Sequence, residues 1–134
     1  MTFEGGCYCK AVRYAVDGDP VFKGLCHCRE CQYISGGSAN VFMVVAPAAF
    51  TYTKGQPKAF TRSDLEEPVT REFCPACGTH LVSRARGGAM TILKVGTMDD
   101  PSLFGMPQMA IWTSEKQCFQ AIPEGVAQFE KLPG

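Results

Sequence analysis

The sequence has no net charge and no block of like charge. Its 13 basic residues balance 13 acidic residues, so the formal net charge at pH 7 is zero. A protein that follows a phosphate backbone usually carries a basic stripe. The chain lacks such a stripe, and we therefore expect no nucleic-acid partner.

Long hydrophobic runs are also missing. The longest apolar stretch, residues 41–50 (VFMVVAPAAF), is far shorter than the roughly 20 residues of a membrane-spanning helix. The first ten residues, MTFEGGCYCK, lack the positive patch and apolar run of a secretory signal peptide. We therefore expect a cytoplasmic protein without a membrane partner. A length of 134 residues is the common size of one domain, here residues 1–134.

Helical patterns are scarce. They are confined to residues 27–35 and a turn at 125–132, which excludes a helical bundle or a doubly wound sheet. Runs rich in β-branched and aromatic residues dominate instead, separated by Gly, Pro and Asp. The predicted fold class is mainly β. Strands are expected over 11–16, 39–46, 49–55, 58–63, 79–85, 89–96 and 109–114.

Cysteine, by contrast, is abundant, and most of it is clustered. In a reducing cytosol, closely spaced cysteines are more typical of metal sites than of disulfides. Disulfides and an iron–sulfur cluster are the alternatives. The eight cysteines are Cys7 and Cys9 in CYC, Cys26, Cys28 and Cys31 in CHCREC, Cys74 and Cys77 in CPAC, and the isolated Cys118.

The segment FCPACGT has the form of a zinc knuckle, a tight turn in which two thiolates and nearby N–H groups converge on a tetrahedral ion. One knuckle supplies two ligands, and CYC is the cluster that offers two and no more. We therefore predict a structural zinc on Cys7, Cys9, Cys74 and Cys77. Such an ion would tie together two distant hairpins.

The remaining trio, Cys26, Cys28 and Cys31, predicts a second zinc site that is one protein ligand short. An open position on zinc is typical of catalytic sites, and a thiolate-rich site favours another sulfur there. A thiol bound in this way ionises near neutral pH.

Three side chains compete for the fourth position on this second zinc. His27 is adjacent to its own cysteine neighbours, and adjacent residues rarely reach the same ion. His80 is more typical of a surface or hydrogen-bonding role, which leaves Cys118 as the main competitor. The open site is the preferred interpretation, with two zinc ions per chain.

Four segments in order, GGCYCKAVRY, CHCRECQYISGG, REFCPACGTHL and VGTMDDP, resemble the glutathione-dependent formaldehyde-activating enzyme family, which includes centromere protein V. The resemblance implies an Mss4-like fold of several coiled antiparallel β-sheets with zinc-binding loops. It assigns the structural zinc to the outer cysteine pairs and the catalytic zinc to Cys26, Cys28 and Cys31. It also implies a carbon–sulfur lyase that adds glutathione to formaldehyde, a small aldehyde, giving S-(hydroxymethyl)glutathione.

The chain departs from the family at several positions. Lys10 stands where glycine is frequent, Gln32 where a basic residue is frequent, and Ala110 where histidine is common. These departures concern the substrate more than the metal sites. Arg29, Tyr33 and Ser35 are candidates for stabilising the alkoxide that forms in the addition.

A zinc module without catalytic activity is the second hypothesis. It would bind a protein partner, or another thiol compound, and its exposed apolar patch would lie at residues 103–112 (LFGMPQMAIW).

Overall fold

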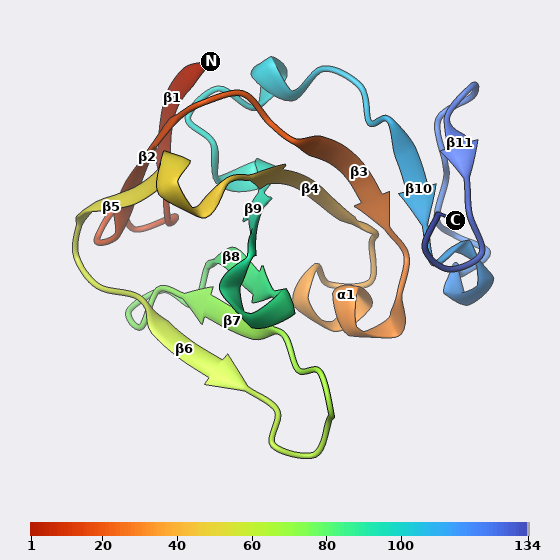
Figure 1. Cartoon of the computed structure of the whole chain (residues 1–134), viewed down its shortest axis with the longest axis horizontal. Coiled ribbons are helices and arrows are strands. Elements are labelled where there is room, and N and C mark those ends of the chain that lie inside the picture. Colours follow the sequence, from red (N-terminus) through yellow and green to blue (C-terminus); the bar gives the residue numbers. More distant parts are fainter. Residues whose placement is uncertain (134) are drawn as a thin grey trace.

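The structure is a computed structural model that describes residues 1–133 (Figure 1). No helix in this range is long and apolar enough to cross a membrane. The strands are β1 (Thr2–Gly6), β2 (Arg13–Asp17), β3 (Phe22–Cys26), β4 (Asn40–Val45), β5 (Phe50–Lys54), β6 (Lys58–Thr61), β7 (Thr70–Phe73), β8 (His80–Ala85), β9 (Met90–Lys94), β10 (Met109–Ile111) and β11 (Ala127–Gln128). The helices are α1 (Arg29–Ile34) and the 3₁₀ turns η1 (Pro47–Ala49), η2 (Arg86–Gly88), η3 (Val95–Thr97), η4 (Pro101–Phe104) and η5 (Thr113–Glu115).

The strands form two sheets. The smaller has the order β1-β2-β5, and the larger has the order β11-β10-β3-β4-β9-β8-β7-β6. The prediction of a mainly β fold built from antiparallel sheets is confirmed. One strand differs from it: β10 runs parallel to both β3 and β11, because the chain crosses over from β9 before it enters β10.

The main core lies between the two sheets. Tyr14 and Phe50 from the smaller sheet pack in one cluster with Met43 and Leu93 from the larger sheet. The Tyr14 and Phe50 rings stack with their centroids 5.1 Å apart. Burying each such side chain contributes about 2 kcal/mol, so this cluster holds the two sheets together.

The opposite face of the larger sheet carries the helix and the second cysteine cluster. Phe42 and Val44 of β4 pack there with Cys26 and Cys31, and α1 contacts β4. Lys94 of β9 is the register partner of Phe42, and directly opposite residues share a face of a sheet. A lysine is therefore placed on the apolar face that supports the cysteines.

Residue propensities predicted the secondary structure of several short segments incorrectly. The helical turn expected over 125–132 is wrong, because Ala127 and Gln128 pair with Met109 and Ala110 as strand β11. Strands β1, β3 and β7 were not predicted at all. Their sequences, TFEGG, FKGLC and TREF, contain glycine or charged residues that weaken the strand pattern.

Candidate metal centres

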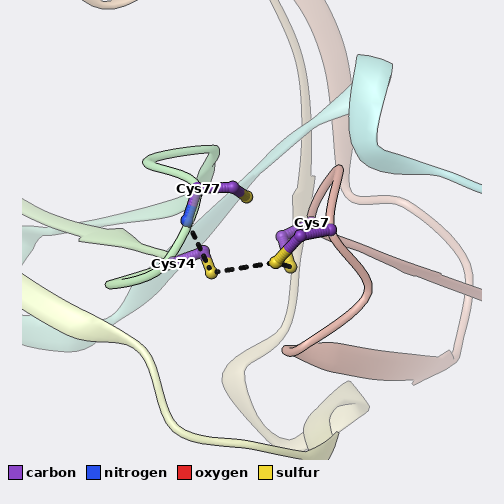
Figure 2. Close-up of side chains that lie close together, drawn as sticks. Cys7, Cys74 and Cys77 are labelled. Carbon is purple, nitrogen blue, oxygen red and sulfur yellow. Dashed lines mark hydrogen bonds between the residues drawn. The ribbon is translucent and has the colours of Figure 1, made fainter.

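The first cysteine cluster joins two turns that lie far apart in the sequence. Cys7 and Cys9 lie between β1 and β2, whereas Cys74 and Cys77 lie between β7 and β8. The four Sγ atoms lie within 4.8 Å of one another. Figure 2 shows the sulfur atoms of Cys7 and Cys74 pointing toward each other from the two turns. These are the four residues that the sequence assigned to one site.

Backbone N–H groups surround the two buried sulfur atoms of this cluster. The N–H of Val12 donates to Cys7 Sγ (3.2 Å), and the N–H groups of Ala76 and Cys77 donate to Cys74 Sγ (3.3 and 3.4 Å). Such bonds stabilise thiolates, as in zinc knuckles. The turn closes at Gly78, whose φ of +78° lies in the left-handed region that favours glycine.

Thr79 supports the same cluster from its rim. Its hydroxyl oxygen accepts a hydrogen bond from the N–H of Tyr8 (3.1 Å) and thereby joins the two turns. The same hydroxyl lies 3.2 Å from Cys77 Sγ, and this contact, with the backbone N–H of Thr79, lowers the pKa of the Cys77 thiol to about 5. The rim of the site therefore favours an ionised sulfur.

The sulfur spacing fits a tetrahedral ion. Cys9 Sγ lies 3.7 Å from Cys7 Sγ and 3.8 Å from Cys74 Sγ. A Zn–S bond of about 2.3 Å places the sulfur atoms of a tetrahedral site about 3.8 Å apart. All eight cysteines lie within the described residues and are free thiols, which argues against the disulfide alternative. The donor set is therefore suited to a structural zinc ion.

The second cluster is built where β3 passes into α1. Cys26 is the last residue of β3, Cys28 is the N-cap of α1, and Cys31 lies in the helix. Their Sγ atoms lie within 4.8 Å of one another, and the N–H of Cys31 donates to Cys28 Sγ (3.3 Å). Cys26 and Cys31 are buried, whereas Cys28 is partly exposed. Access to this trio is therefore at Cys28.

The three thiols do not share negative charge equally. Hydrogen bonds from Cys26 and Cys31 hold the pKa of Cys28 far below its usual value, and the positive charge of Arg71 acts in the same direction. The same contact with Cys28 raises the pKa of Cys26 to about 12. The trio thus gathers negative charge at its accessible sulfur, an arrangement suited to a soft divalent cation.

None of the three competing side chains joins the trio. Within residues 1–133, no fourth His, Cys, Asp or Glu side chain lies within the same 4.8 Å. His27 is fully buried and its Nδ1 lies 2.9 Å from Gln120 Oε1. Cys118 is exposed, and His80 belongs to β8. Among the described residues, the trio therefore offers three sulfur ligands without a fourth protein side chain beside them.

Two cations near the trio were missed by the sequence analysis. Lys94 is only 8% exposed, and its Nζ has no hydrogen-bond partner within the described chain. Burial lowers the pKa of Lys94 to about 8, and the charges of Cys31, Cys26 and Cys28 oppose this shift. The sequence feature that could have identified Lys94 is a lysine inside the strand-like run TILKVG. Arg71 gave no sequence signal, because β7 itself was not predicted.

The three residues proposed as alkoxide donors have other contacts. Ser35 Oγ lies 2.6 Å from the carbonyl oxygens of both Cys31 and Ser38 and so ends the helix. The guanidinium of Arg29 lies over the ring of Tyr33, 5.0 Å from its centroid. Tyr33 is 79% exposed. Lys94 is better placed than any of them to act on charge at the trio.

The chain is similar to one known family and to a solved structure. The model of a family described as "Glutathione-dependent formaldehyde-activating enzyme" matches residues 2–115. The crystal structure of a protein from Rhodobacter sphaeroides has a TM-score of 0.61 and 16% sequence identity, covering 78% of this chain and 96% of that chain. At this identity the likeness concerns the fold. All seven clustered cysteines lie in the matched range, whereas Cys118 lies beyond it.

Proposed function

Because the chain belongs to the glutathione-dependent formaldehyde-activating enzyme family, we propose that it is a zinc-dependent carbon–sulfur lyase. Its reaction is the reversible addition of glutathione to formaldehyde, and residues 1–134 act as one zinc-binding domain. The observation that carries this proposal is the trio of Cys26, Cys28 and Cys31, which has one accessible sulfur and no fourth protein ligand among the described residues.

The two clusters have different roles in this proposal. Cys7, Cys9, Cys74 and Cys77 would hold a structural zinc ion, and Cys26, Cys28 and Cys31 would hold the catalytic one. A zinc ion held by the trio would lower the pKa of a thiol bound to it, so that glutathione would be present as a thiolate. The first cluster offers four sulfur ligands and the trio offers three, and this difference supports the two roles.

The reaction itself needs little from side chains. The glutathione sulfur forms a bond to the carbonyl carbon of formaldehyde, and the electron pair of the C=O bond moves to oxygen. The proton given up by the thiol is returned to that oxygen, and the reverse reaction breaks the same C–S bond. The chain must therefore hold the thiol and stabilise negative charge on the carbonyl oxygen.

Lys94 is the residue of this chain suited to stabilise that charge. Its ammonium group is buried on the face of the sheet that supports the trio and has no hydrogen-bond partner in residues 1–133. Charge interactions are stronger in such a water-poor environment than in bulk solvent. Lys94 thus offsets the negative charge of the thiolates and of the developing alkoxide.

The protein-binding alternative has less support. Its expected apolar patch, residues 103–112, is interrupted by buried side chains, since Phe104, Ala110 and Ile111 belong to the core. Leu103 and Met106 are the large hydrophobic side chains of this segment that are strongly exposed. Two separated side chains are a small surface for a stable protein partner.

Cobalt substitution tests binding of the thiol. Adding glutathione to the cobalt-loaded protein should intensify the sulfur-to-cobalt charge-transfer band and change the ligand-field spectrum. The Cys28→Ser variant, which lacks one ligand of the trio, is the control and should lose this response. A spectrum that ignores glutathione would contradict an open thiol-binding position.

Exchange NMR of glutathione with formaldehyde tests catalysis, because the addition also proceeds without an enzyme. Exchange should be faster with the protein than with Cys28→Ser. The Lys94→Met variant should slow exchange while the cobalt band still responds to glutathione. If the protein and Cys28→Ser give equal exchange rates, the lyase assignment is wrong and the chain only binds the thiol.

A further inference from the structure

A cavity of about 600 Å³ lies beside α1, the helix that begins after Cys28 and contains Cys31. Such a volume suits a small molecule. Its walls come from one face of α1, from strands β6, β7 and β8, and from the loop between β6 and β7. The larger apolar side chains of the wall are Tyr33, Ile34, Phe60, Leu65, Val69 and Phe73.

The charged part of the wall is mainly basic. Lys58, Arg62 and Arg71 line the cavity together with a single acid, Glu30. Glu30 is shared between Arg71 (3.3 Å) and Arg62 (3.8 Å), and Arg62 also pairs with Asp64 just outside the lining (2.7 Å). With Asp64 counted, the three cations still exceed the two acids by one charge. His80 also lines the cavity, and its Nδ1 is buried without a hydrogen-bond partner among the described residues. The cavity therefore combines apolar walls with groups that attract carboxylates.

Arg71 connects this cavity to the trio. Its side chain is held by Ser83 Oγ (3.2 Å) and Glu30, and it is 14% exposed. Glu30, which pairs with Arg71, stands next to Cys31 in α1, so the cavity and the trio share one short helix. Cys28 is the accessible sulfur of the trio. A molecule whose thiol lies at the trio can therefore extend toward the basic cavity.

From this juxtaposition we infer that the cavity binds the carboxylate-bearing part of the thiol cosubstrate, so that the enzyme prefers anionic thiols over neutral or cationic ones. This inference rests on the proposed function. Lys58, Arg62 and Arg71 are the specificity residues. Glutathione, with two carboxylates and one ammonium group, has this chemistry, whereas its diethyl ester has the same thiol without the carboxylates.

Two probes separate carboxylate recognition from thiol binding. S-Methylglutathione keeps both carboxylates but cannot form a thiolate, and its binding to the zinc-loaded protein is measured by isothermal titration calorimetry. We expect the Lys58→Gln/Arg62→Gln variant to bind it about tenfold more weakly, which corresponds to the loss of two exposed charge contacts. The matched control, Lys54→Gln/Lys131→Gln, removes two exposed lysines that do not line the cavity and should bind as the unchanged protein does.

The second probe is the diethyl ester, followed by the charge-transfer band of the cobalt-loaded protein. The ester should give the same final spectrum as glutathione but require about tenfold more ligand. Equal affinities for the two thiols, with no effect of the cavity variant, would overturn the inference and leave thiol binding at the trio intact. If neither thiol changes the spectrum while S-methylglutathione binds in a charge-dependent way, the proposed function fails and the cavity remains a site for acidic ligands. Zinc content and circular dichroism show whether each variant is folded.

Discussion

Lys10 occupies a backbone position that suits glycine. Its φ is +68°, in the left-handed region that glycine adopts without steric cost. The residue lies in the turn that carries Cys7 and Cys9, and its N–H donates to the Cys7 carbonyl (3.1 Å). The strain is therefore located beside the first metal centre.

Replacing this residue should stabilise the protein. We expect Lys10→Gly to raise the free energy of unfolding by about 1 kcal/mol, because relief of the strain exceeds the added entropy of the unfolded chain. Urea denaturation of the zinc-loaded protein measures the change. Lys10→Ala is the control, since it removes the same side chain and keeps the strain. A Lys10→Gly variant no more stable than Lys10→Ala would contradict this explanation.

Tyr14 should make the stability sensitive to alkaline pH. Burial raises the pKa of Tyr14 to about 12, although its hydroxyl lies 2.9 Å from Thr97 Oγ1. In the unfolded chain the pKa is about 10. The unfolded state therefore loses its proton first, and on the order of 2 kcal/mol of stability, present below pH 10, is lost as the pH rises toward 12.

The Tyr14→Phe variant isolates this effect. Its free energy of unfolding should lack the part of the alkaline decline that ionisation of Tyr14 causes, while other groups affect both proteins alike. Denaturation between pH 9 and 11.5 gives the difference curve. A difference that stays constant over this range would show that Tyr14 ionises equally easily in the folded and unfolded states.

At the scale of elements, the two cysteine clusters have different structural contexts. The first cluster connects the β1–β2 turn of the smaller sheet to the β7–β8 turn of the larger sheet. Cys7 and Cys74 belong to the core between these sheets. The trio instead involves the end of one strand and one short helix. Loss of the first site should therefore affect the whole fold, and loss of the second should have a local effect.

Serine substitutions at Cys74 and Cys28 test this difference. We expect Cys74→Ser to lower the free energy of unfolding by at least about 3 kcal/mol or to prevent folding, because a structural zinc contributes directly to folding. Cys28→Ser should remain folded and hold one zinc equivalent fewer. Circular dichroism and elemental analysis report the two outcomes, and equal loss of folding in both variants would make the trio structural too.

The sequence predicted best those groups of residues that lie close together in the chain. Cysteine spacing was enough to group Cys74 with Cys77 and Cys26 with Cys28 and Cys31, because each turn places its own sulfur atoms together. The helix expected over 27–35 appears as α1. Lys94 and Arg71 could not be placed, since their proximity to the trio depends on strand register between segments distant in the chain. For the same reason β11 was not predicted, because its pairing with β10 outweighs a weak helical pattern in its own sequence.

For the molecule as a whole, the two centres should exchange metal independently. They lie in separate clusters of side chains, and no Cys, His, Asp or Glu belongs to both in the described structure. We expect purified protein to carry between one and two zinc ions per chain, and a chelator to remove one of them without unfolding the chain. Cys118→Ala is the control and should keep both ions. Cooperative loss of both metals together with structure would contradict independent sites.

The parallel pairing of β10 with β3 has a consequence for how the chain is made. Cys26 is the register partner of Ile111, so β3 leaves the ribosome roughly 85 residues before its neighbour. At synthesis rates of roughly 5–20 residues per second this delay is on the order of 10 s. During that time β3 has an open edge on the side away from β4, and open strand edges invite pairing with other chains. The trio begins at the end of this strand, so early metal capture at Cys26, Cys28 and Cys31 would order the chain next to this open edge during synthesis.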